Sequence, residues 1–207
     1  MAAKKIVLDG SQEGRDYVQT EITSLMKAKH HPFILRLLHH QFMDYLDDFT
    51  QLTMHELWLI TEFCGEGNLA KYHANNSVSF EDKVRIGRQC AGAIAFLHNM
   101  EPPILHRDVK PGNILMKREG DSLHAKMADF GLAQSDSKKS VFTTFGGSLY
   151  FMAPEFFGPG HKHKKSVDVF ALGLVLRYLL MAAAGQDLED EDCECLWILH
   201  SLEKVIS

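Results

Sequence analysis

The stretch His106-Arg107-Asp108-Val109-Lys110-Pro111-Gly112-Asn113 decides how this chain is interpreted, because two further short motifs follow it in order. Asp129-Phe130-Gly131 comes next, and Ala153-Pro154-Glu155 comes after that. Each motif is short, and an isolated His-Arg-Asp is most simply a turn with mixed charges. The order and spacing of all three, with Asn113 in register behind Asp108, argue against chance agreement.

The residue types in these motifs suit phosphoryl transfer. That reaction needs positioned reactants and neutralised phosphate charge, with little covalent help from the protein. Asp108 can orient an incoming hydroxyl as a general base, and Lys110 can reach the transferring phosphate. Asn113 and Asp129 supply hard oxygen ligands, which suit Mg²⁺. The sequence therefore predicts a phosphoryl-transfer site at these four residues.

Composition and charge limit the class of protein to which the chain can belong. The chain has 207 residues, 45% hydrophobic and 24% charged, which are ordinary globular values. A formal net charge of −5 argues against a nucleic-acid partner and against an anionic membrane. The most apolar stretch, 167–185, carries Asp168 and Arg177 and favours a buried helix over a membrane span. Four cysteines without a CxxC pair favour an intracellular setting, cytoplasmic or nuclear.

Hydrophobic periodicity predicts a β-rich first part and a helical second part. In the first part, one helix is expected over 17–29, an irregular acidic stretch at 44–48, and strands at 6–8, 33–38 and 57–61. In the second part, helices are expected over 80–100 and 168–184, and short strands at 104–105, 114–116 and 125–127.

This order predicts an α+β fold with two lobes joined by a short connector. The small lobe is β-rich with one helix and covers residues 1–62. The hinge covers residues 63–68, where Phe63-Cys64-Gly65-Glu66-Gly67 is a short, flexible sequence. The larger, mainly α-helical lobe covers residues 69–207.

The three motifs resemble those of eukaryotic-type protein kinase domains, and the similarity covers nearly all of the chain. A lysine two residues after the catalytic aspartate resembles the serine/threonine branch rather than the tyrosine branch. The resemblance implies ATP bound between two lobes and transfer of its γ-phosphate to Ser or Thr hydroxyls of a protein substrate. It implies that Asp108 is the catalytic base, that Lys110 contacts the γ-phosphate, and that Asn113 and Asp129 hold Mg²⁺.

The resemblance extends to the first residues of the chain. Met1-Ala2-Ala3-Lys4 is similar to the family's Val-Ala-x-Lys strand motif, which implies that Lys4 contacts the α- and β-phosphates and pairs with Glu21. Taken alone, Lys4 is better explained as an exposed N-terminal lysine. The resemblance also implies an adenine site. It implies that Thr61 is the gatekeeper behind the adenine, that Glu62 and Cys64 are hinge residues, and that Ala2 and Leu115 lie on either face of the ring. It implies a packed hydrophobic spine of Leu25, Leu37, His106 and Phe130.

Between Asp129 and Glu155 the resemblance predicts an activation segment. The regulatory residues that it implies are Arg107, Thr143, Thr144 and Ser148. A phosphate added to Thr144 by an upstream activating kinase could pair with Arg107 through charge-assisted hydrogen bonds. An unmodified polar loop is an equally good interpretation of these hydroxyl residues.

The sequence departs from the family pattern at both ends. No Gly-rich loop precedes Lys4, and the family has further helices after the position of Ser207. These departures predict a kinase domain truncated at both ends. Two alternatives to an active kinase therefore stay open. One is a non-catalytic kinase-like binding module, and the other is an inactive fragment.

Overall fold

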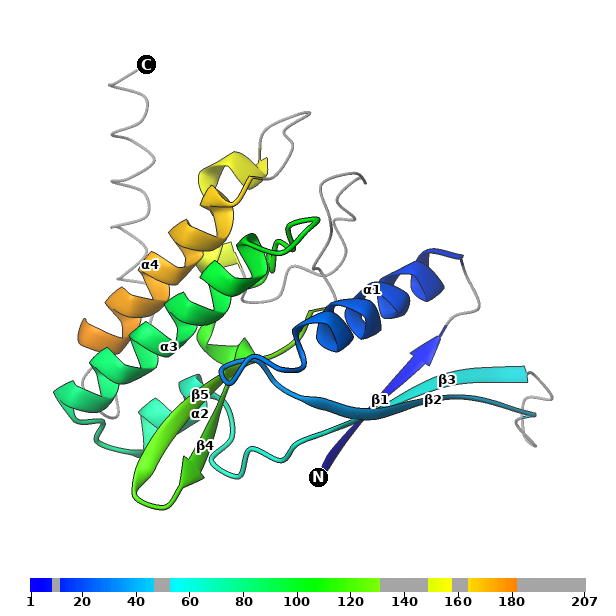
Figure 1. Cartoon of the computed structure of the whole chain (residues 1–207), viewed down its shortest axis with the longest axis horizontal. Coiled ribbons are helices and arrows are strands. Elements are labelled where there is room, and N and C mark those ends of the chain that lie inside the picture. The colour runs from blue at the N-terminus through cyan, green and yellow to red at the C-terminus, as the bar shows by residue number, and fades with distance from the viewer. Residues whose placement is uncertain (9–11, 47–52, 131–148, 158–163, 182–207) are drawn as a thin grey trace.

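Figure 1 shows the computed structural model, which describes residues 1–8, 12–46, 53–130, 149–157 and 164–181. Its first part is a three-stranded antiparallel sheet with one helix. Its second part contains the other helices and a two-stranded sheet. The mixed α+β class and the order of strands before helices are as predicted. The residue boundaries of the two lobes and the hinge stay a prediction.

The first sheet has the strand order β1-β3-β2, so that β3 lies in the middle. Its strands are β1 (Ala2–Leu8), β2 (Leu37–Leu46) and β3 (Thr53–Thr61). The helix α1 (Gln12–Ala28) packs its apolar stripe of Val18, Ile22 and Leu25 into the core that also contains Leu57 and Leu59 of β3. Alternate residues of β3 face this core, as a period of two requires.

The strand expected at 33–38 is observed later in the chain, as β2 at Leu37–Leu46. Residues 33–35 bond instead to β5 (Ser122–Met127), with Leu35 N–H donating to the Met127 carbonyl at 2.9 Å and Met127 N–H donating to Phe33 at 2.8 Å. The stretch at 44–48, expected to be irregular, continues β2 as far as Leu46. Polar residues are tolerated there because β2 is an edge strand, exposed along most of its length.

The second part is built on three helices and the β4–β5 hairpin. Its α-helices and strands are α2 (Leu69–Asn75), α3 (Phe80–His98), β4 (Ile114–Glu119), β5 and α4 (Ser166–Met181). The short 3₁₀ helices η1 (Pro111–Asn113), η2 (Leu149–Phe151) and η3 (Pro154–Phe157) lie between them. The helix α3 begins where Ser79 accepts a hydrogen bond from Asp82 N–H. The prediction omitted α2, which is too short to show periodicity, and placed a strand at 104–105 where no named strand lies. No helix among the described residues is long and apolar enough to cross a membrane.

Two helical glycines give a test of how α3 and α4 pack. A Cβ at Gly87 would lie 2.6 Å from Leu176 Cδ2, whereas one at Gly173 would meet nothing within 4 Å. Alanine is favoured over glycine inside helices by about 0.8–1 kcal/mol, so Gly173→Ala should stabilise the fold by up to that amount. At Gly87 the same gain is offset by the shift that Leu176 Cδ2 must make, so Gly87→Ala should stabilise the fold less than Gly173→Ala or destabilise it by up to about 2 kcal/mol. Urea unfolding of both variants checks this, and equal shifts would contradict the close contact.

Candidate active site

The structure brings Lys4, Glu21 and Asp129 together from β1, α1 and the segment after β5. Lys4 Nζ lies 2.9 Å from Glu21 Oε1 and 3.3 Å from Asp129 Oδ1. Glu21 is 3% exposed at its side chain, whereas Lys4 and Asp129 are 45% and 41% exposed. A buried carboxylate therefore anchors a lysine whose amino group stays accessible.

Electrostatics keep this lysine charged. Burial opposes the charge on Lys4, but the carboxylates of Glu21 and Asp129 outweigh it, so that the pKa of Lys4 is raised. Burial raises the pKa of Glu21, although the charge of Lys4 opposes this. Glu21 Oε2 is buried and has no hydrogen-bond partner among the described residues. A charged ammonium group that is held in place and stays partly exposed suits recognition of a polyphosphate.

A second set of contacts surrounds Asp108. Asn113 Nδ2 donates to the Asp108 carbonyl at 2.9 Å and to its Oδ2 at 2.7 Å. Lys110 Nζ lies 2.8 Å from the same Oδ2. Because the amide of Asn113 donates through its nitrogen, its oxygen is left as an acceptor. Asp108 is therefore held in one orientation.

The backbone of this loop is held by the side chain of Asp168. Asp168 lies in the first turn of α4 and is 1% exposed. Its carboxylate accepts from His106 N–H at 2.8 Å and from Arg107 N–H at 2.7 Å, and lies 2.7 Å from His98 Nε2. The bond to His98 was missed, since nothing in the sequence joins a histidine at the end of α3 to a residue 70 positions later.

Two site residues have a positive φ, a backbone conformation that residues other than glycine rarely adopt. Arg107 has φ of 63° and Asp129 has φ of 64°. Such angles cost about 1–3 kcal/mol each and persist only where the surroundings impose them. His106 supplies part of that support, since its Nε2 lies 3.1 Å from the Ala128 carbonyl and its ring lies 4.9 Å from that of Phe130. The predicted spine residues Leu25, Leu37, His106 and Phe130 are all buried.

The residues predicted to hold adenine lie on both sides of the connector. Ala2 is the register partner of Thr61 in the first sheet, and Thr61 is buried. Leu115 on β4 bridges to Asn68, the last residue of the predicted hinge. Cys64 is a free thiol, half-buried, and burial raises its pKa. Ala2 and Leu115 are also half-buried, which leaves part of each side chain accessible.

The side chain of Glu62 forms a network of contacts that the sequence interpretation did not predict. It is 8% exposed and accepts from Arg36 N–H, Lys117 Nζ and Lys126 Nζ, each at 3.0 Å. Burial opposes the charge, but these donors outweigh it and lower the pKa of Glu62. The carboxylate thereby joins the first sheet to β4 and β5. One signal in the sequence could have predicted this network. A turn at Gly120 sets the register of the β4–β5 hairpin, and that register places Lys117 and Lys126 on the same face of it.

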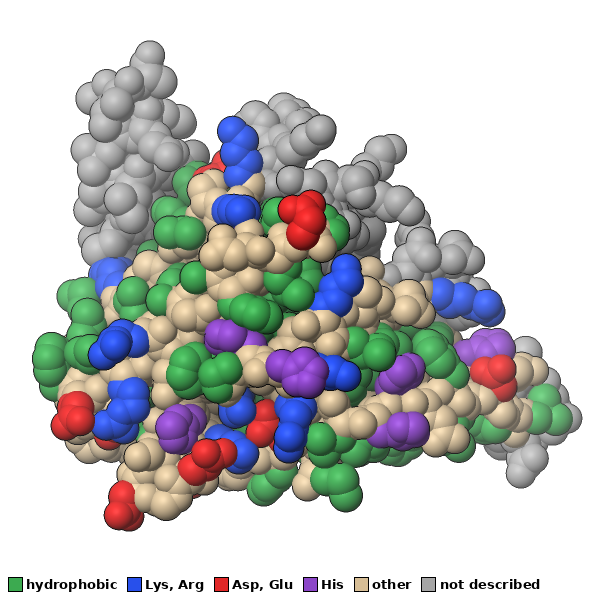
Figure 2. Space-filling view, viewed as in Figure 1, with side chains coloured by type: hydrophobic (Ala, Val, Ile, Leu, Met, Phe, Trp, Pro, Cys, Tyr) green, Lys and Arg blue, Asp and Glu red, His purple; other side chains and the backbone are tan. Residues whose placement is uncertain are grey.

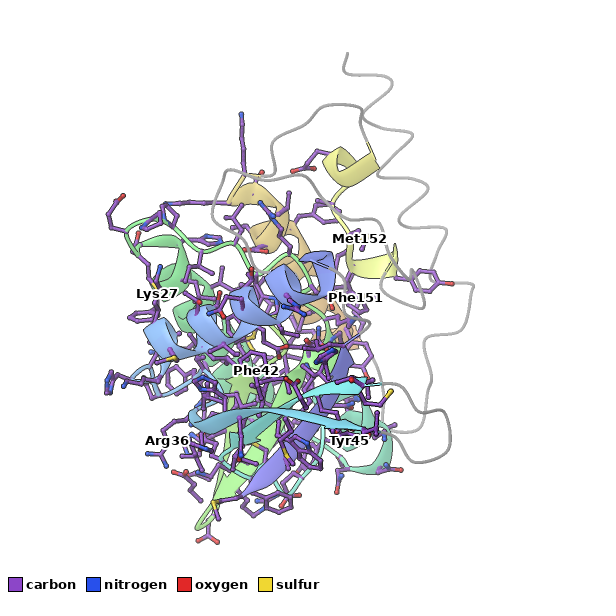
Figure 3. The ribbon with its side chains drawn as sticks, turned by 90° about the vertical axis from the view of Figure 1, so that its right-hand side faces the viewer. Lys27, Arg36, Phe42, Tyr45, Phe151 and Met152 are labelled. Carbon is purple, nitrogen blue, oxygen red and sulfur yellow. The ribbon has the colours of Figure 1, made fainter. Side chains whose placement is uncertain are left out.

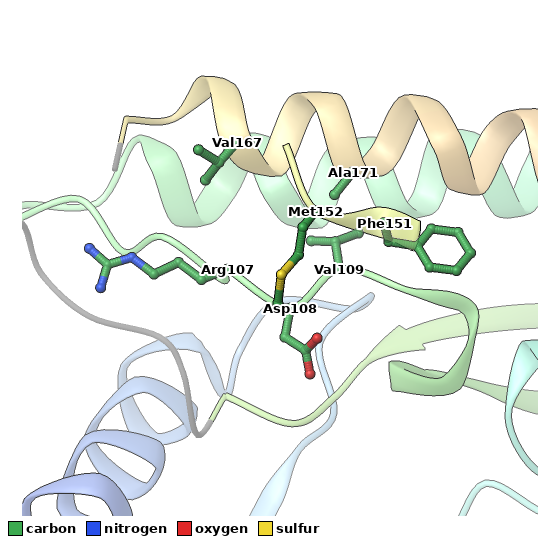
Figure 4. Close-up of a pocket in the computed structure, with 7 residues that line it drawn as sticks. All are labelled: Arg107, Asp108, Val109, Phe151, Met152, Val167 and Ala171. Atoms are coloured by element: carbon green, nitrogen blue, oxygen red, sulfur yellow. The ribbon is translucent and has the colours of Figure 1, made fainter. Parts of the chain in front are cut away.

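A small hollow lies beside the loop at 106–113, which is the predicted catalytic loop (Figure 4). Its lining residues are Arg107, Asp108, Val109, Phe151, Met152, Val167 and Ala171. Residues from the catalytic loop and from the segment at 149–157 thus meet next to Asp108. The predicted regulatory residues Thr143, Thr144 and Ser148 lie outside the described residues.

The comparisons with known proteins agree with this geometry. Residues 1–203 match the family model for the protein kinase domain. The chain is 36% identical to the serine/threonine-protein kinase ULK3 of Xenopus laevis over 167 residues, or 80% of this chain and 32% of that protein. It is 32% identical to the receptor-like kinase TMK4 of Arabidopsis thaliana over 184 residues, or 84% of this chain and 18% of that protein.

Among the similar proteins, alignments cover between 7% and 32% of the relative's own length, so the chain corresponds to a minor part of each. The match to the family model includes Lys4, Glu21 and the loop at 106–113. The family model matches nearly the whole chain. The chain therefore belongs to the protein kinase domain family.

Proposed function

We propose that this protein is a serine/threonine protein kinase, which transfers the γ-phosphate of ATP to Ser or Thr hydroxyls of a protein substrate. The observation that carries the proposal is the position of Lys4, held by buried Glu21 and within 3.3 Å of Asp129. A scaffold would gain little from a partly exposed lysine between two carboxylates. The serine/threonine assignment is supported by Lys110, paired with Asp108 at 2.8 Å.

Each residue has a distinct role in this proposal. Lys4 contacts the α- and β-phosphates, and Glu21 fixes its position. Asp108 accepts the proton of the substrate hydroxyl while a bond forms from that oxygen to the γ-phosphorus and the bond to ADP breaks. Lys110 neutralises charge on the transferring phosphate. The residues proposed to surround adenine are Ala2, Thr61, Glu62, Cys64 and Leu115.

The residues also fit a bound Mg²⁺. Asp129 offers a carboxylate that is 41% exposed, and Asn113 keeps its amide oxygen free of the bonds made by its nitrogen. No group of three or more His, Cys, Asp or Glu among the described residues could hold a metal. Mg²⁺ accepts such sparse sites, because it takes one or two protein oxygens together with phosphates and water. When bound, the ion would neutralise phosphate charge.

Replacing Asp129 by asparagine should abolish Mg²⁺-dependent ATP binding while leaving the fold intact. In the parent chain, Mg²⁺·ATP at about one hundred times Kd should add about 2.7 kcal/mol to the stability. At about 2–4 °C per kcal/mol for a chain of this length, that corresponds to a rise in Tm of about 5–11 °C, measured against ATP with a chelator. The asparagine variant should show no such difference. The control variant Asp121→Asn, in the turn between β4 and β5, removes the same charge as Asp129→Asn and should keep the full rise in Tm.

The same measurement separates the proposal from its rivals. A cooperative transition without any shift would favour the non-catalytic binding module. The absence of a cooperative transition would favour the inactive fragment. We place the protein inside the cell, in cytoplasm or nucleus. The low cysteine count supports this, as do the free thiols of Cys64 and Cys90.

A further inference from the structure

One stretch of the chain has a charge opposite to that of the whole. Residues 22–43 contain three Lys or Arg and four His but no Asp or Glu, although the formal net charge is −5. The stretch runs from the middle of α1 through the turn after it and into β2. Positive charge is therefore concentrated along one continuous part of the first lobe.

The cations of this stretch are exposed and uncompensated. Lys27, Lys29 and Arg36 are all exposed to solvent. Within the part of the chain that the structure describes, no carboxylate lies within 4.0 Å of their charged groups. Elsewhere a carboxylate pairs with each of the residues Lys4, Lys5, Arg85, Lys110, Lys117, Arg118 and Lys126. Some exposed lysines elsewhere, such as Lys71 and Lys164, also have no ion pair among the described residues, so what sets these three positions apart is that residues 22–43 contain no Asp or Glu.

The helix α3 extends the positive region onto the second lobe. The turn after α1 packs on α3, since the rings of His31 and Phe96 stack at 4.6 Å and Phe33 lies 3.7 Å from the Cβ position of Gly92. Arg88 stands one helical turn before Gly92, on the same side of α3, and is exposed. We call this region the basic surface, with the members Lys27, Lys29, His30, Arg36, His39 and Arg88.

The basic surface lies away from the hollow beside Asp108. Figure 2 shows Lys, Arg and His side chains gathered on the face where α1, β2 and α3 approach one another. In Figure 3, Lys27 and Arg36 lie along one edge, and Phe151 and Met152 lie along the opposite edge. A partner on the basic surface would therefore leave the hollow beside Asp108 open.

Local structure accounts for only part of this pattern. Lys27 lies in the last turn of α1 and Lys29 follows it, where a positive charge stabilises the carboxyl end of a helix. That explanation does not cover Arg36 at the entry to β2 or Arg88 in the middle of α3. Four cations without an ion pair, at the end of α1, before β2 and in the middle of α3, form a surface complementary to negative charge.

We propose that the basic surface binds an acidic segment of a partner protein. The net charge of −5 opposes the approach of any polyanion to the rest of the molecule, so an anion that binds will be directed to this region. A flexible acidic segment can follow the exposed cations from α1 across Arg36 to Arg88. Binding here does not require ATP, so it can be tested whether or not the chain transfers phosphate.

The test uses a fluorescein-labelled oligoglutamate peptide, with oligolysine of equal length for comparison. Fluorescence anisotropy at low ionic strength should show saturable binding of oligoglutamate only, weakening as salt is added. The triple variant Lys27→Glu/Lys29→Glu/Arg36→Glu should raise its Kd about tenfold or more, a factor that corresponds to about 1.4 kcal/mol. A matched triple variant, Lys71→Glu/Lys164→Glu/Lys165→Glu, reverses the same amount of exposed charge elsewhere and should change the Kd much less.

Several outcomes would overturn the proposal. Equal weakening in both triple variants would mean that net charge alone directs the peptide, and no binding by the parent chain would remove the site. Displacement of the peptide by a short single-stranded DNA at lower concentration would assign the surface to nucleic acid instead. A dimer in sedimentation velocity that the first triple variant abolishes would make a second copy the occupant. Cooperative unfolding of both variants, checked by circular dichroism, shows that each is folded.

Discussion

Replacement of Asp108 by alanine should lower the rate of phosphate transfer by about two to four orders of magnitude while leaving ATP affinity nearly unchanged. The structure separates the two properties. Asp108 Oδ2 is held by Asn113 at 2.7 Å and by Lys110 at 2.8 Å, whereas Lys4, which is proposed to bind the α- and β-phosphates, is held by Glu21 and Asp129. Removing the base therefore affects the reacting hydroxyl far more than the nucleotide.

The measurement is transfer of radiolabelled phosphate from ATP to a generic acceptor protein, with ATP affinity taken from the thermal shift. Asp108→Asn serves as a second variant, because it keeps the shape of the side chain and removes its basicity. Asp121→Ala, an exposed aspartate in the β4–β5 turn, should retain full activity. Transfer by the alanine variant at the parent rate would remove Asp108 as the base. A parallel loss of ATP affinity would show instead that the loop had rearranged.

Much of this site could be predicted from sequence because its members lie in short motifs. Asp108 and Asn113 are five residues apart in one loop, so their contact is local. Lys4 and Glu21 are 17 residues apart, and a strand followed by a helix packed on it brings them together. The order of strands and helices followed from hydrophobic periods, which depend on neighbouring residues alone.

What sequence did not predict depends on distant contacts or on register. The bond between His98 and Asp168 joins the end of α3 to the start of α4, and no local pattern encodes it. The network around Glu62 needs the register of the β4–β5 hairpin. The end of β2 was misplaced because an exposed edge strand with polar residues shows no alternation. The positive φ of Arg107 and Asp129 is imposed by surroundings rather than by residue type.

Removal of the Asp168 carboxylate should have the largest effect on stability. Asp168→Ala leaves the N–H groups of His106 and Arg107 and the ring of His98 without their acceptor in a site that is 1% exposed. Breaking a buried hydrogen-bonded charge in this way costs about 3–5 kcal/mol. By contrast, Asp44→Ala removes an exposed partner of His55 and should cost about 1 kcal/mol or less. Urea unfolding at neutral pH measures both.

The contribution of Asp168 should also depend on pH in a defined direction. Burial alone would raise its pKa, but the bond from His98, the interaction with His106 and the two backbone donors outweigh it and lower the pKa. A lowered folded-state pKa gives stability that is fully present above the unfolded value of about 3.9 and is lost as pH falls through the folded value. The stability difference between the parent and Asp168→Asn should therefore be constant from pH 7 down to about pH 5 and shrink below about pH 4. A difference that persisted unchanged at pH 3 would mean that the carboxylate charge contributes nothing and that only the shape of the side chain holds the loop.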